Sequence, residues 1–100
     1  MPIHDATLSS GSLAAGTTAV VAGPALVFGY ILSGGTAASS LSLNDGAGGT
    51  TKWTDSIAAQ TAAGDATVSL AFEVPIVFST SLSVVVSGTA ATAFVQYIPI

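Results

Sequence analysis

The stretch Ala66–Ile98 decides the fold of this chain. It begins with ATVSLAFEV (66–74), in which large apolar side chains alternate with smaller or polar ones: Val68, Leu70, Phe72 and Val74. The same alternation returns in SLSVVVS (81–87), and the β-rich AFVQYI (93–98) follows after the turn residues GTAA (88–91). A period of two places successive side chains on opposite faces of an extended chain. The stretch therefore predicts antiparallel strands with one apolar face.

The residues before this stretch indicate more short strands, divided by glycine-rich turns. β-branched and hydrophobic runs predict strands over 7–13, 17–22, 25–32, 38–43 and 50–57. The whole chain then has eight or nine short strands and no convincing long helix. This spacing predicts an all-β fold, a single-domain antiparallel β-sandwich or jelly roll. Residues 1–8 are predicted as a flexible or docking N-terminal arm, and residues 9–100 as the β-sandwich domain.

Glycine and proline mark special positions in these strands and turns. Gly29, inside the apolar run 25–32, predicts a bulge or a close approach of another backbone. Pro75 predicts a sheet edge or a bulge, because proline cannot donate a hydrogen bond to a neighbouring strand. The sequence SGGT at 33–36 predicts a hairpin turn. Residues 57–63 fit either one or two helical turns or a strand that continues into a loop.

Residues 19–32 are apolar enough to require comparison with a membrane helix. The segment AVVAGPALVFGYIL has no charge, but it is shorter than the roughly 20 residues that a spanning helix needs. Gly23 and Pro24 interrupt it, and no Lys or Arg flanks it to set an orientation. Its β-branched and aromatic residues favour two strands around a turn instead.

The composition limits what the chain can bind. Of its 100 residues 50% are hydrophobic and only 6% are charged, with a mean hydropathy of +0.77 and a net charge of −4. Lys52 is the only basic side chain, which argues against binding to nucleic acid or to an anionic membrane. No cysteine is present, so disulfides and thiol chemistry are excluded. A surface so poor in charge favours a homo-oligomer or a component of an assembly.

The polar residues show no pattern typical of a catalytic or metal site. His4, the only histidine, stands beside Asp5 in the predicted arm, without the positioned nucleophile that a catalytic triad requires. The other acids are spread over predicted turns and strands: Asp45, Asp55, Asp65 and Glu73. The sequence NDG at 44–46 resembles part of a calcium loop but lacks the remaining ligands. We expect no catalytic residue, no cofactor and no metal, and therefore no enzyme.

Three aromatic residues are candidates for ligand contact. Trp53, Tyr30 and Tyr97 could form an aromatic platform that stacks on a sugar, as in a carbohydrate-binding module. Alternatively, Trp53 belongs to the core or to an interface, since Trp combines a large apolar area with one polar group. Few polar side chains accompany Trp53 to hydrogen-bond a sugar, and this favours the core or interface.

The overall pattern resembles small virion structural proteins of tailed bacteriophages, of the capsid decoration or cement type. Four segments carry the likeness: LVFGYIL (26–32), LSLNDG (41–46), FSTSLSVVVSGTA (78–90) and FVQY (94–97). Such proteins are similar in length, free of cysteine, poor in charge, all-β and rich in Ala, Gly, Ser and Thr. Related-looking sequences also occur as phage neck, tail or fibre components.

The resemblance implies a β-sandwich or jelly roll, commonly a homotrimer, on the outer surface of the capsid. Such a protein stabilises the phage head by bridging subunits of the major capsid protein. The arm Met1–Leu8 or an exposed strand would make the capsid contact, for example by strand addition. The predicted capsid or subunit contacts are Ile3, His4, Leu8, Tyr30, Trp53 and Ile100.

Overall fold

The computed structural model describes residues 8–100, and these residues form nine β-strands. The strands are β1 (Leu8–Ser9), β2 (Leu13–Ala14), β3 (Gly16–Val21), β4 (Ala25–Ser33), β5 (Ser39–Asp45), β6 (Thr50–Ile57), β7 (Thr67–Phe78), β8 (Leu82–Ser87) and β9 (Thr92–Pro99). Within this range no helix has the length and hydropathy that a membrane crossing needs. The apolar run 19–32 is divided between β3 and β4, as two strands around a turn. The predicted all-β class is confirmed.

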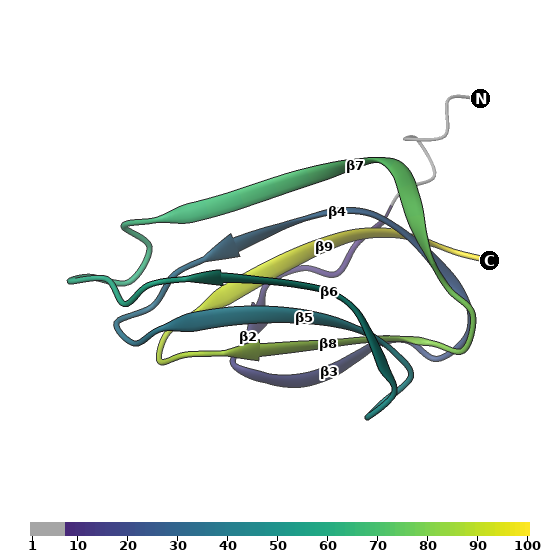
Figure 1. The fold of residues 1–100 in the computed structure, drawn as a ribbon, viewed down its shortest axis with the longest axis horizontal. Coiled ribbons are helices and arrows are strands. Elements are labelled where there is room, and N and C mark those ends of the chain that lie inside the picture. The colour runs from purple at the N-terminus through teal and green to yellow at the C-terminus, as the bar shows by residue number, and fades with distance from the viewer. Residues whose placement is uncertain (1–7) are drawn as a thin grey trace.

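Two antiparallel sheets face each other as a β-sandwich (Figure 1). The five-stranded sheet has the order β1–β9–β4–β7, and β2 also pairs with β9. The four-stranded sheet has the order β3–β8–β5–β6. From β3 onward, the chain crosses between the sheets at every connection except the β5–β6 hairpin. The strands β7, β6 and β3 are edge strands, each paired on one side only.

The core lies between the sheets and comes from the inward positions of each strand. Leu41 and Leu43 are fully buried there, and the intervening Ser42 faces outward, as the alternation predicts. The buried hydrophobic residues are Leu13, Ala25, Val27, Tyr30, Leu32, Leu41, Leu43, Ile57, Phe78, Leu82, Val84, Val86, Ala91, Ala93 and Val95. Burial of this apolar area is the main force that holds the two sheets together.

Gly29 lies at a bulge in β4, where the backbone of β7 approaches closely. The register against β9 moves from Val27 to Gly29, which leaves one extra residue in β4. A Cβ atom at Gly29 would lie 2.5 Å from the carbonyl oxygen of Leu70, so only glycine fits without a shift of the backbone. Both parts of the prediction for Gly29 are confirmed.

The strand β7 bends where its pairing with β4 is interrupted (Figure 1). Ala71 pairs with Gly29 and Ile76 pairs with Val27, so four residues of β7 stand opposite one residue of β4. Pro75 falls inside this irregular segment, on an edge strand, as predicted. Phe72 and Ile76, on either side of the bend, pack against the core, but Val74 between them lies in the segment without pairing and is 79% exposed. The predicted inward position of Val74 is wrong for this reason.

The segment SGGT at 33–36 is not a hairpin turn. It carries the chain from β4 in one sheet to β5 in the other. A Cβ at Gly35 would lie only 1.8 Å from the carbonyl oxygen of Thr89, so the glycine is required by the packed loop before β9. The loop after β6 packs on the same place, since the amide of Gln60 donates to the carbonyl of Gly35 (3.0 Å). Thus the strand β6 ends at Ile57 and a loop follows, rather than a helix.

Candidate functional site

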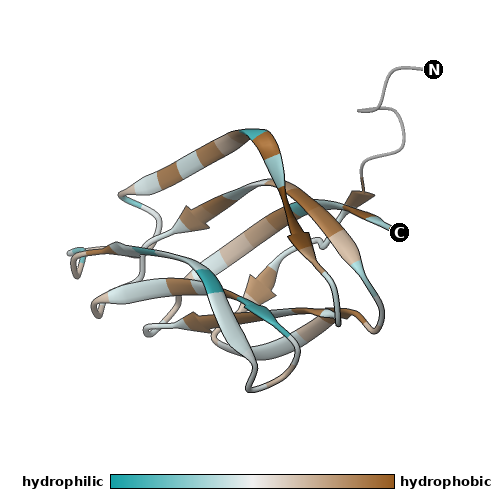
Figure 2. Cartoon of the chain, turned by 45° about the vertical axis from the view of Figure 1, so that its right-hand side comes forward, coloured by the Kyte–Doolittle hydropathy of each residue, from teal (hydrophilic) through white to brown (hydrophobic). Residues whose placement is uncertain are grey.

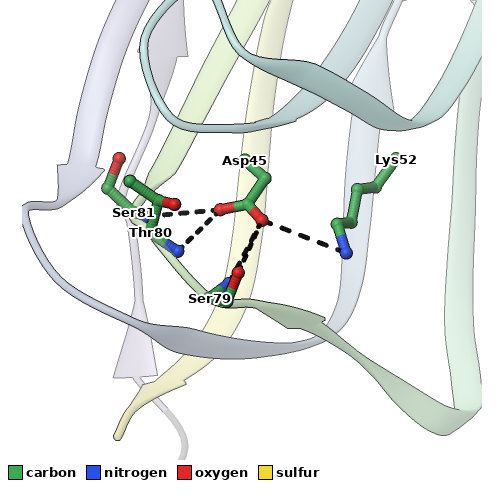
Figure 3. A network of polar contacts seen from close by, with 5 residues as sticks. All are labelled: Asp45, Lys52, Ser79, Thr80 and Ser81. Atoms are coloured by element: carbon green, nitrogen blue, oxygen red, sulfur yellow. Dashed lines mark hydrogen bonds and ion pairs between the residues drawn. The ribbon is translucent and has the colours of Figure 1, made fainter.

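The carboxylate of Asp45 is held by the turn between β7 and β8 (Figure 3). Its Oδ1 accepts hydrogen bonds from the amides of Thr80 (2.8 Å) and Ser81 (3.4 Å). Its Oδ2 accepts from the amide (3.3 Å) and the hydroxyl (3.0 Å) of Ser79, and lies 4.0 Å from Lys52 Nζ. The hydrogen bond from the Thr80 amide is the main reason why the pKa of Asp45 lies below its ordinary value.

This network gives Asp45 a structural role. Donors from residues 79–81 use the lone pairs that a calcium ion would need, so the partial likeness of 44–46 to a calcium loop has another explanation. Asp45 fastens the end of β5 to the β7–β8 turn, which connects the two sheets. The sequence predicted a turn at Asp45, but not its partners 34 to 36 residues further along the chain.

A second cluster joins the two sheets at the edge formed by β6 and β7. The Tyr30 hydroxyl of β4 donates to Asp55 Oδ2 of β6 (2.5 Å) and accepts a hydrogen bond from Trp53 Nε1 (2.9 Å). Phe72 of β7 packs beside both rings, with centroid distances of 6.0 Å to Tyr30 and 5.1 Å to Trp53. Burial, followed by the hydrogen bond to Asp55, raises the pKa of Tyr30.

This cluster changes the interpretation of the three aromatic residues. Tyr30 is only 1% exposed, because it points inward from β4. Tyr97 lies on β9, opposite Val27, and packs against the core. Trp53 is 37% exposed beside a shallow hollow lined by Thr51, Lys52 and Thr54. The structure therefore brings Trp53 and Tyr30 together, but as a link between strands and not as an exposed platform. The third aromatic ring of this cluster is Phe72, and not Tyr97.

The other predicted contact residues lie at the ends of the described chain. Leu8 begins β1, pairs with Tyr97 and is 48% exposed. Ile100 is 62% exposed, and its amide donates to the carbonyl of Pro24 (3.0 Å). Ile3 and His4 lie outside the described residues, as does most of the predicted arm.

The outer face of the five-stranded sheet carries large apolar side chains. Cross-strand partners point to the same side of a sheet, so the pairs Ile31–Phe94 and Leu26–Ile98 mark one surface. They alternate with the inward residues of β4 and β9. We call the following six residues the apolar face: Leu26, Phe28, Ile31, Val77, Phe94 and Ile98. Ile31 is 36% and Val77 49% exposed, and the other four are half-buried.

The outer face of the four-stranded sheet has a different chemistry. Its positions are found by the same register, since Ser42 pairs with Thr54 on one side and with Val85 on the other. We call the hydroxyl-bearing residues on this side, which surround Val85, the hydroxyl face: Thr17, Ser40, Ser42, Thr54, Ser56 and Ser87. The hydroxyls of Ser40 and Ser87 are 2.6 Å apart and hydrogen-bonded. Short hydroxyl side chains satisfy each other and water, so this face needs no protein cover.

Charged side chains are absent from β1, β2, β3, β4, β8 and β9. Within residues 8–100 the charges lie in β5, β6, β7 and the connection after β6: Asp45, Lys52, Asp55, Asp65 and Glu73. The part of the apolar face on β4 and β9 is thus formed by strands without any charge. Figure 2 shows hydrophobic residues following one another along β4, whereas they alternate along the first part of β7.

No family model matches the chain, and neither the curated proteins nor the solved structures contain a match. Within residues 8–100 no three His, Cys, Asp or Glu side chains are grouped so as to hold a metal ion. The apolar face is the feature on which a function can be argued.

Proposed function

We propose that this chain is a non-enzymatic virion structural protein, which decorates the outer surface of a tailed-bacteriophage capsid. The observation that carries the proposal is the apolar face on a small sandwich with few charges. Exposed apolar area of this kind marks a contact site, because covering it removes apolar surface from water. Such a surface suits an obligate interface better than a transient one, since obligate interfaces are the more hydrophobic.

The sequence resemblance supplies the kind of assembly. The segments LVFGYIL and FVQY, which resemble capsid decoration proteins, are the same segments that place Leu26, Ile31 and Phe94 on the apolar face. The partner in this proposal is the major capsid protein, and the effect is stabilisation of the phage head. A protein that binds the assembled shell, and binds its separated subunits less well, stabilises the shell by mass action.

Co-sedimentation with phage heads tests this proposal. Heads are assembled from the major capsid protein of the same phage, mixed with the purified chain and separated on a gradient. The chain is expected to sediment with the heads at a fixed ratio and to raise the temperature at which they disassemble. A chain that stays at the top of the gradient and leaves the heads unchanged would overturn the proposal.

The role of the N-terminal arm needs a separate variant. Removal of residues 1–7 spares Leu8 and Ser9, which pair with β9, so the sandwich keeps all nine strands. If the arm makes the capsid contact, this variant loses co-sedimentation and keeps its unfolding temperature. Unchanged co-sedimentation would assign the contact to the folded domain.

Binding of a sugar is a second candidate, which rests on the exposed part of Trp53. The ring lies beside Thr51, Lys52 and Thr54, but its N–H is already used by Tyr30. Only the ring surface is left for stacking on a sugar. A glycan array with the wild type and Trp53→Ala tests this function. Binding by the wild type that the variant loses would support it, and a wild type without binding would remove it.

A further inference from the structure

We infer that the apolar face packs against the apolar face of a second copy of this chain, around a two-fold axis. The inference deepens the proposed function and rests on it: the apolar face joins two copies into the unit that decorates the capsid, and the contact with the major capsid protein falls to another part of each copy. A patch that associates with itself forms an isologous contact, in which each residue of one copy meets its counterpart region on the other. The resulting dimer would present two hydroxyl faces outward.

The edges of both sheets are poor alternatives to this face. An unpaired edge can accept a further strand, and proteins block it with charges, prolines, bulges or very short strands. β7 carries Glu73 and Pro75 in its bend, and β6 carries Lys52 and Asp55. β1 and β2 have two residues each, and the pairing of β3 is irregular beyond Ala19. Each edge therefore has at least one feature that hinders the addition of a strand. For this reason we infer that the two copies meet through the apolar face and not through a sheet edge.

The charge pattern favours a copy of the same chain as the partner. The surface formed by β4 and β9 carries no charge, so it has no electrostatic attraction for a strongly basic or acidic protein. Two copies of the chain carry the same net charge of −4, and within residues 8–100 their charged side chains lie on β5, β6, β7 and the β6–β7 connection. When the apolar faces meet, the charges of β5 and β6 lie on the sheet that faces away from the partner, and Glu73 lies in the bend of the edge strand β7.

The outer surface of the three strands that carry the apolar face is close in size to what a specific interface needs. β4 has nine residues, which span about 30 Å, and β9, β4 and β7 side by side cover about 15 Å. A flat rectangle of that size has an area of about 450 Å² per copy, or about 900 Å² for two copies. The side chains that project from the sheet add further accessible surface to this value. A specific interface is expected to bury about 1,000 Å² or more in total. Two sheets packed face to face also reproduce the layer geometry of the sandwich itself.

Gln96 provides a polar group that suits a two-fold axis. It is half-buried between Phe94 and Ile98 on β9, and it pairs with Gly29, which has no side chain to cover it. A side-chain amide has both donors and an acceptor. Two such amides related by a two-fold axis can exchange hydrogen bonds, so a Gln96 from each copy would be satisfied by the other.

Charge substitution at Gln96 tests the contact and its symmetry together. Gln96→Glu and Gln96→Lys each place like charges next to each other across the axis, and each is expected to raise the dimer Kd by about 100-fold. A mixture of the two variants pairs Glu with Lys and is expected to recover the dimer. Sedimentation equilibrium over a dilution series measures all three samples. Val85→Glu, on the outer side of the four-stranded sheet, is the matched control and is expected to stay dimeric.

Three outcomes would overturn this inference: a wild type that is monomeric throughout the series, a trimer, or a mixture that does not recover. Circular dichroism of each variant shows whether it is folded. If a variant at Gln96 fails to fold, Phe94→Ser in the wild-type background repeats the test without a charge. The gradient with phage heads is independent of these results. A dimer that ignores heads refutes the capsid proposal alone, and a monomer that binds heads refutes the self-association alone.

Discussion

The apolar face and the hydroxyl face are built by the same kind of alternating strand, yet they differ in every property that governs contact. On the five-stranded sheet, outward positions hold side chains such as Phe94 and Ile98. On the four-stranded sheet, the equivalent positions hold Ser40, Ser42 and Thr54. One face gains free energy when another surface covers it, whereas the other loses hydrogen bonds to water unless they are replaced.

The difference shows that a low content of charge has two separate consequences in this molecule. The hydroxyl face stays compatible with water because Ser and Thr provide donors and acceptors. The apolar face has no such compensation, since Gln96 is its one strongly polar neighbour on the central part of β9. We therefore expect association with other protein chains through the five-stranded sheet. Substitutions on the outer face of that sheet should abolish association, and substitutions on the outer face of the four-stranded sheet should not.

The largest expected effect on stability separates the inside of β4 from its outside. Leu32→Ala leaves a cavity at a fully buried position. It should lower the free energy of unfolding by about 2–5 kcal/mol, the usual range for Leu→Ala in a core. The adjacent Ile31→Ala lies on the apolar face and should cost less than about 1 kcal/mol in the dissociated chain. Urea denaturation at low protein concentration measures both. Equal losses would mean that Ile31 also belongs to a core within one chain.

A smaller effect is expected at the link between the two sheets. Tyr30→Phe removes the hydroxyl that joins Asp55 to Trp53, and leaves two partly buried polar groups without this partner. The expected cost is about 1–3 kcal/mol, accompanied by a shift in Trp53 fluorescence. The apolar face is not touched, so the oligomeric state should stay the same. Dissociation of Tyr30→Phe would show that the two regions are coupled.

Asp45 gives a pH-dependent effect on the side of the four-stranded sheet. Its pKa is lowered in the folded chain, so its ionised form adds stability above the ordinary value of 3.8, and this is lost as pH falls through the folded value. Asp45→Asn should therefore be less stable than the wild type at neutral pH, with a difference that shrinks below about pH 4. Thermal unfolding across this range measures the difference. A gap that does not change with pH would contradict the role of the carboxylate.

The smallest expected effect is at Ser83, which lies between Ala19 and Asn44 on the outer side of the four-stranded sheet. Its Oγ is buried without a hydrogen-bond partner among the described residues. Ser83→Ala removes the unsatisfied group, so stability should change by less than about 0.5 kcal/mol or rise slightly. Thermal unfolding gives the value. A clear loss of stability would indicate a partner for this hydroxyl, such as a bound water.

Much of the fold could be predicted because strand alternation is a local property. The strands β4, β6, β8 and β9 fall within one or two residues of the predicted ranges, and Gly29 and Pro75 lie at irregular positions as expected. The glycine pair at 33–36 predicts a hairpin, and this prediction is wrong, since a glycine pair indicates a turn but not which sheet the next strand joins. That choice depends on packing against Thr89, which is more than 50 residues away.

The contact surface was only partly visible in the sequence. The run 25–32 is apolar at both inward and outward positions, which predicts a strand buried on both faces or facing a neighbouring subunit. The partners of that run on β9 could not be assigned, because the register of Ile31 with Phe94 spans more than 60 residues. The link of Tyr30 to Asp55 was likewise hidden, since it joins strands of two different sheets.

Light scattering over a dilution series tests the central claim, that the apolar face is a protein contact, most directly. The wild type is compared with Ile31→Ser/Phe94→Ser on the apolar face and with Ser42→Ala/Thr54→Ala on the hydroxyl face. The account predicts a wild type and a hydroxyl-face variant of twice the 9.7 kDa chain mass, and an apolar-face variant that is monomeric and folded. A monomeric wild type, or an apolar-face variant that still associates, would contradict it.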